Sequence, residues 1–149
     1  MNVEEKVKSI VEKISGLNYN FNDWTRANVE LDYERLPICL YILPPSGTLL
    51  FKNGNIRDYP STIIAFLDKA DFDFDSTENE VTVERMKFFA KQFVVGLNSS
   101  GLFQPLPENI TYQAIYDKLD VNLTGVAISV ELKEINGICI ENIMNKNKC

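Results

Sequence analysis

The residues best suited to chemistry in this sequence are three aspartates at alternate positions, Asp71, Asp73 and Asp75. Calcium-binding loops take oxygen ligands from their first, third and fifth positions, so this spacing raises the question of a calcium site. The rest of that motif is missing, because Ser76 stands where the loop needs glycine and Thr82 stands where a bidentate glutamate belongs. The sequence therefore favours a strand end with solvated carboxylates, and we expect no bound metal.

Other catalytic groups are scarce. The chain contains no histidine, which removes the commonest general base and the usual partner of a nucleophilic serine or cysteine. The cysteines Cys39, Cys139 and Cys149 lack C-x-x-C spacing, and we expect all of them to be free thiols. No glycine-rich phosphate loop is present. The sequence therefore predicts no catalytic residue, no cofactor and no enzymatic activity.

The charge balance bears on the kind of partner. Acidic residues outnumber basic ones by 21 to 15, which gives a net charge of −6 at pH 7. A chain with this charge repels nucleic acid and anionic membranes, so sequence-specific DNA binding is not expected. The N-terminal segment is acidic and amphipathic, unlike a signal peptide, and no apolar run approaches the length of a membrane span. These features predict a protein that matures in a cytosol without a membrane partner.

Apolar residues at helical spacing predict two helices. The first is expected over residues 3–15, where Asn2 and Glu5 can form a capping box at the N-terminus. The second is expected from Glu78 to Leu97 as the main core helix. Its apolar stripe consists of Val83, Met86, Ala90, Phe93, Val94 and Leu97.

Continuous or alternating apolar stretches predict the strands. They are expected at residues 36–43, 48–52, 55–59, 61–67, 110–116, 121–133 and 138–140. Asn53-Gly54 is the sequence typical of a tight hairpin turn. Pro60 is expected to interrupt the sheet, because proline cannot donate a ladder hydrogen bond. Gly125 is expected to mark a bulge.

The order of these elements predicts an α+β fold, with a mainly antiparallel sheet and with the N-terminal helix and one long central helix packed on one face. A length of 149 residues suits a single domain. We place this domain at residues 1–141 and expect a polar C-terminal tail over residues 142–149.

The C-terminal strand pair resembles that of a known group of proteins. The stretches Tyr116 to Val126 (YDKLDVNLTGV) and Glu131 to Glu134 (ELKE) are similar to those of small neck and tail-completion proteins of tailed bacteriophages and prophages, including the tail-terminator type. The resemblance extends to the long helix from Glu78 to Leu97 and to the sheet before it. It rests on chain length, element order and a long late hairpin.

This resemblance implies a virion structural protein of the phage head–tail connector or neck. Members of that group form rings between head and tail, and DNA passes through the centre. The implied partners are copies of the chain itself and portal, neck or tail-tube proteins. DNA would pass without sequence-specific binding, and assembly would take place in the host bacterial cytoplasm. An acidic ring suits such a channel, because it repels phosphate groups.

Two parts of the chain are candidates for ring contacts. The acidic stretch with Asp71, Asp73, Asp75, Glu78 and Glu80 is expected to face the channel or a neighbouring subunit, and a solvated surface loop is the alternative.

The stretch from residue 17 to 32 is the second candidate, as an arm that reaches a neighbouring subunit with Trp24 and Arg26. The tail over residues 142–149 is a further candidate for such a contact. The sequence also leaves a different class of function open, namely a cytosolic protein-binding domain of the immunity or adaptor type with no catalytic activity.

Overall fold

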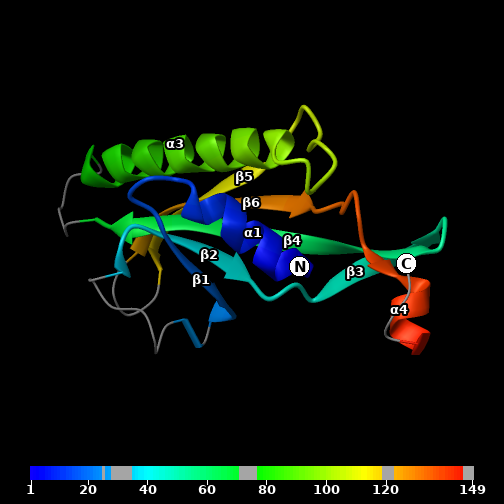
Figure 1. Cartoon of the computed structure of the whole chain (residues 1–149). Coiled ribbons are helices and arrows are strands. Elements are labelled where there is room, and N and C mark those ends of the chain that lie inside the picture. The colour runs from blue at the N-terminus through cyan, green and yellow to red at the C-terminus, as the bar shows by residue number, and fades with distance from the viewer. Residues whose placement is uncertain (25, 28–34, 71–76, 119–122, 146–149) are drawn as a thin grey trace.

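The computed structural model describes residues 1–24, 26–27, 35–70, 77–118 and 123–145. A seven-stranded sheet forms its centre, and helices α1 and α3 lie across one face of that sheet (Figure 1). The α+β class is therefore confirmed, as is the packing of the N-terminal helix and the long central helix on one face. None of the described helices is long and apolar enough to cross a membrane.

Helix α1 spans Val3–Glu12 and begins with the expected capping box. The Asn2 side chain accepts a hydrogen bond from the Glu5 backbone N–H at 2.8 Å, and the Glu5 carboxylate accepts one from the Asn2 backbone N–H at 3.3 Å. The helix ends before residue 15, and Gly16, with a φ of +78°, turns the chain into the sheet.

Helix α3 spans Thr77–Ser99 and provides the main core contact, as expected. Its buried stripe packs on the strands below, and Phe93 is fully buried with its ring 5.8 Å from that of Phe66. The members of this stripe are Val83, Met86, Ala90, Phe93 and Leu97.

The body of the sheet is mixed, because it contains both parallel and antiparallel strand pairs. Its strands are, side by side, β1 (Asn18–Asn22), β2 (Ile38–Ile42), β4 (Asn55–Lys69), β6 (Leu123–Glu131) and β5 (Tyr112–Lys118). Strand β1 pairs with β2 in parallel, whereas the remaining pairs of this body are antiparallel. The sheet carries apolar residues on both faces: one face packs on the helices, and the other holds a second buried cluster that includes Leu40 and Leu67.

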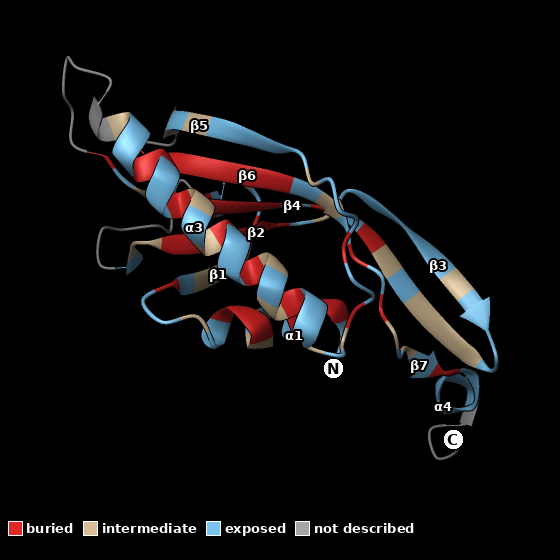
Figure 2. Cartoon of the chain, turned by 90° about the horizontal axis from the view of Figure 1, so that it is seen from above, coloured by how far each residue is buried: buried red, intermediate tan, exposed pale blue. Residues whose placement is uncertain are grey.

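Strand β4 is longer than the body of the sheet and continues into a projecting arm. Its second part pairs with β2 and β6, and its first part pairs with β3 (Ser46–Lys52) and β7 (Ile138–Cys139). Figure 2 shows this hairpin reaching past the body, with β7 and helix α4 (Ile140–Asn145) beside its end. We call residues 46–59 together with 137–145 the arm.

Pro60 does not divide β4, so the expectation of two separate strands at 55–59 and 61–67 was wrong. Pro60 lies at the point where β4 passes from the arm to the body, since the ladder with β6 begins at Ser61. Its carbonyl still accepts a hydrogen bond from the Leu132 N–H at 3.0 Å. The missing N–H of proline is tolerated at this point because the pairing with β3 ends here and the pairing with β6 begins.

Two glycine predictions had different outcomes. The Asn53-Gly54 turn is confirmed, with φ values of +53° and +72° at the end of the arm. The irregularity expected at Gly125 is present in the ladder beside it: the β5–β6 register shifts between Ile115, the partner of Gly125, and Lys118, with the extra residue on β5. Gly125 is required for a different reason, because a Cβ atom there would lie 1.9 Å from the carbonyl oxygen of Phe66.

The C-terminal region differs from expectation in two respects. Residues 140–145 form helix α4, whereas the sequence predicted that the polar tail begins at residue 142. Cys139 is disulfide-bonded, so the expectation of a free thiol there was wrong. Spacing along a chain does not show which sulfur atoms a fold brings together. Cys39 is a buried free thiol, as expected, and burial raises its pKa. Cys149 lies outside the described residues.

Candidate assembly surfaces

One face of the arm is apolar and exposed. Leu49 and Phe51 lie on the same side of β3 and are 61% and 65% exposed. Phe51 pairs with Ile56 on β4, and Ile56 pairs in turn with Ile138 on β7. Cross-strand partners share a face, so Leu49, Phe51, Ile56 and Ile138 form one apolar row, which we call the arm surface.

The arm surface has the properties of a contact site. Among the described strands, β3 pairs with β4 alone, so within this part of the chain its outer edge presents backbone N–H and C=O groups without a ladder partner next to exposed apolar side chains. Edges of this kind pair readily with another chain, and apolar patches on a surface mark interaction sites. Helix α4 lies at the same end of the molecule (Figure 2). Two of its residues, Ile143 and Met144, are exposed.

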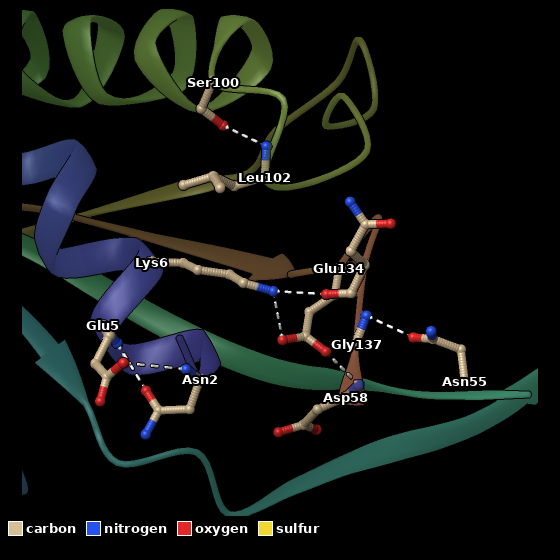
Figure 3. Close-up of polar contacts among 10 residues, drawn as sticks. Asn2, Glu5, Lys6, Asn55, Asp58, Ser100, Leu102, Glu134 and Gly137 are labelled. Atoms are coloured by element: carbon tan, nitrogen blue, oxygen red, sulfur yellow. Dashed lines mark hydrogen bonds and ion pairs between the residues drawn. The ribbon is translucent and has the colours of Figure 1, made fainter. Parts of the chain in front are cut away.

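A buried ion pair fixes the base of the arm (Figure 3). The Lys6 amino group on α1 lies 2.9 Å from a Glu134 carboxylate oxygen and donates a second hydrogen bond to the Asn136 carbonyl at 2.8 Å. The other Glu134 oxygen accepts a hydrogen bond from the Asp58 backbone N–H at 2.8 Å. Both charged side chains are less than a tenth exposed. Because buried charges must remain paired, these bonds hold α1, β4 and the segment before β7 together.

The position of Asp58 next to this pair predicts a pH effect on stability. Partial desolvation, together with the nearby negative charge of Glu134, raises the pKa of the Asp58 carboxyl above its usual value. The folded protein therefore holds this proton more tightly than the unfolded chain, so the cost of ionising Asp58 is absent at low pH and develops as the pH rises above about 4. We expect Asp58→Asn to raise the melting temperature at pH about 7, with the difference disappearing below pH about 3.5. Thermal unfolding followed by circular dichroism measures this, and an equal difference at both pH values would contradict it.

Helix α3 carries a second exposed apolar surface. Val81, Phe88 and Val95 recur at seven-residue intervals, which places them on one side of the helix, and they are 54%, 60% and 68% exposed. We call them the α3 stripe. On one side of Phe88 a hollow extends past Pro37, and on the other a second hollow runs between α3 and α1. The sequence analysis predicted only the buried side of this helix. The seven-residue spacing of Val81, Phe88 and Val95 also indicates a second apolar side.

A polar hollow lies between α1 and β1. It has a volume of about 670 Å³, and its lining includes Glu4, Arg26 and Arg35. The Tyr19 hydroxyl donates a hydrogen bond to the Glu4 carboxylate at 2.9 Å. Burial, followed by that hydrogen bond, raises the pKa of Tyr19, so its phenol stays neutral and does not act as a base.

The predicted acidic site falls mainly outside the described part of the chain. Asp71, Asp73 and Asp75 lie outside the described residues, and so does the side chain of Glu78, although the backbone of Glu78 belongs to the first turn of α3. Glu80 is exposed in the same turn and lines the hollow beside Phe88. The expectation that these residues face a channel or a neighbour therefore stays a prediction.

The predicted inter-subunit arm is described in part. Trp24 is partly buried and packs against the cluster on the face of the sheet opposite the helices. Arg26 is exposed, and its backbone N–H donates to the Asp23 carboxylate at 2.7 Å. The structure thus gives Trp24 contacts within its own chain, and a contact of Trp24 or Arg26 with a neighbour stays a prediction.

Among the described residues, no cluster of three or more histidine, cysteine, aspartate or glutamate side chains could hold a metal ion. No protein-family model matches this chain, and no curated protein matches it. What the described residues do present is a pair of exposed apolar surfaces on separate elements, the arm surface and the α3 stripe.

Proposed function

We propose that this chain is a structural subunit that joins copies of itself into a ring of the phage head–tail connector or neck. The observation that carries the proposal is that one protomer has two unlike apolar surfaces, the arm surface and the α3 stripe, which share no residue. A ring closes through heterologous contacts, which need two different surfaces on every subunit. The phage setting rests on the resemblance of the C-terminal strand pair and of the long helix.

The charge of the chain supports the same proposal. A net charge of −6 per copy would be multiplied around a ring. Such a ring repels phosphate groups, so DNA can pass through its centre without binding to the residues that line the channel. Portal, neck or tail-tube proteins would bind the faces of the ring. The subunit contributes shape and contacts to the virion and performs no reaction.

Light scattering and electron microscopy of the purified chain test this function. The wild type is expected to show particles heavier than the 17.0 kDa monomer and annular in projection. Leu49→Ser with Phe51→Ser should shift the mass to the monomer, because each exposed side chain loses about 1.5–3 kcal/mol of burial in the contact. Thr48→Ser, on the opposite side of the same strand, is the control and should leave the mass unchanged.

A ring contact can also need a preassembled template, so the second readout is co-purification of the tagged chain with portal or tail-tube proteins from phage-producing cells. Copies of the chain at the neck of virions in electron micrographs would support the proposal. A chain that remains monomeric, is absent from virions and binds one protein partner in a single copy would contradict it. That outcome would support the cytosolic protein-binding domain.

A further inference from the structure

A narrow apolar groove opens between α3 and the β5–β6 edge of the sheet. Its volume is about 320 Å³, which is at the small end of the range for ligand sites. Its apolar lining includes Val94 on α3, Ile110 before β5, and Val126 and Ile128 on β6. This groove shares only Val95 with the α3 stripe and no residue with the arm surface. We call it the α3–β5 groove.

Basic and aromatic groups form its rim. Lys87 and Lys91 project from α3, and Tyr112 faces them from β5. The Lys87 amino group lies 4.7 Å from the centre of the Tyr112 ring and 3.0 Å from a Glu84 carboxylate oxygen. Lys91 is exposed and has no ion-pair partner within the described residues. The groove therefore suits a segment that carries both apolar and acidic side chains.

The sequence of this same chain contains such a segment. Residues 71–75 read Asp-Phe-Asp-Phe-Asp, and no basic residue interrupts them. In an extended peptide, alternate side chains point to opposite sides. Bound in that form, Phe72 and Phe74 would enter the apolar floor of the groove, and the aspartates would remain at the rim near Lys87 and Lys91.

Chain length shows which copy must supply the segment. Lys91 lies 14 residues after the start of α3, or about 21 Å along the helix. The link between Ala70 and Thr77 is anchored at both ends, so even doubled back it reaches only about 12 Å from them. The backbone of the segment therefore cannot lie along the groove as far as Lys91 in its own chain.

We propose that the α3–β5 groove of each copy binds residues 71–75 of a second copy of this chain. The contact is head-to-tail, because each copy gives its segment to one neighbour and receives a segment from another. This inference rests on the proposed ring function and names one of the contacts that would hold the ring. It also accounts for the acidic charge of the segment, which matches the two lysines at the rim.

A peptide binding measurement tests the contact directly. A fluorescent peptide with the sequence of residues 68–78 is titrated with the full chain, and binding is followed by anisotropy. The wild type is expected to bind it, and Lys91→Glu should weaken binding at least about ten-fold. Lys8→Glu makes the same charge change on the exposed side of α1 and should leave binding unchanged. Binding should also weaken as salt is added, because the Lys91 charge at the rim is exposed.

A second peptide, with serine in place of Phe72 and Phe74, separates docking in the groove from charge attraction alone. It is expected to lose binding even though all its acidic residues remain. Equal binding of both peptides, equal binding by the Lys91→Glu protein, or no binding up to about 1 mM peptide would overturn the inference.

A charge exchange in the full chain provides the matching test of assembly. Lys87→Glu with Lys91→Glu should abolish the assembly seen by light scattering, and adding Asp71→Lys, Asp73→Lys and Asp75→Lys to the same chain should restore it. Neither lysine is among the buried residues, so circular dichroism should show an unchanged fold. Rings that survive the double glutamate variant would overturn this contact and leave the proposed function standing. Peptide binding without rings or virion association would instead contradict the proposed function.

Discussion

Replacing Lys6 with methionine is expected to lower the free energy of unfolding by about 3–5 kcal/mol. The variant keeps a side chain of similar length but leaves the Glu134 carboxylate buried without its cationic partner at 2.9 Å. The Asn136 carbonyl also loses its donor. A buried charge without a partner retains its full desolvation cost, and this cost makes the expected loss large.

Urea unfolding of two further variants separates this effect from a loss of packing. Glu134→Gln keeps an oxygen to accept the Asp58 N–H but leaves Lys6 charged and unpaired, so it should also destabilise the protein. The double variant retains neither charge of this buried pair and should cost less than the sum of the two single changes. Lys8→Met is the control, because Lys8 is half exposed and its distance to Glu12 is 4.0 Å; it should change stability by less than about 0.5 kcal/mol. Equal losses of unfolding free energy for the Lys6→Met and Lys8→Met variants would contradict the claim that burial of the Lys6–Glu134 pair makes its loss costly.

The Lys6–Glu134 pair also shows where prediction from sequence ends. Its two members are 128 residues apart, and nothing in the local pattern around either one indicates the other. The capping box at Asn2 and the turn at Asn53-Gly54 were predictable, because each depends on residues only a few positions apart. Periodicity shows which face of an element is apolar, but it does not show which strand lies beside which.

The arm was not predicted from the sequence for the same reason, since it depends on which strands pair with one another. The sequence predicted a hairpin at residues 48–59 and a separate strand after Pro60, each with local justification. Only the long-range pairing of β4 with β6 makes one continuous strand of them and leaves β3 beyond the body of the sheet. The exposure of Leu49 and Phe51 is a consequence of that pairing. The candidate surface was therefore not predictable, although its residues were correctly placed on a strand.

The long helix offers the second test with a large expected effect, because it has phenylalanines on opposite sides. Phe93 is fully buried and packs on Phe66, whereas Phe88 is 60% exposed in the α3 stripe. Phe93→Ala is expected to destabilise the fold by about 3–5 kcal/mol, through lost burial and the cavity that remains. Phe88→Ala removes the same atoms from the same helix and should change stability by no more than about 0.5 kcal/mol.

Chemical denaturation of the two variants measures the difference, and light scattering measures the consequence for assembly. Phe88→Ala should weaken assembly while the fold stays intact, because the α3 stripe is one of the two surfaces proposed to meet in the ring. Phe93→Ala should reduce assembly only to the extent that it unfolds the chain, and it should regain assembly under conditions that restore the fold. Similar stability losses at both positions would show that the buried and exposed sides of α3 are wrongly assigned. A stable Phe88→Ala protein that assembles as well as the wild type would remove the α3 stripe from the ring contact.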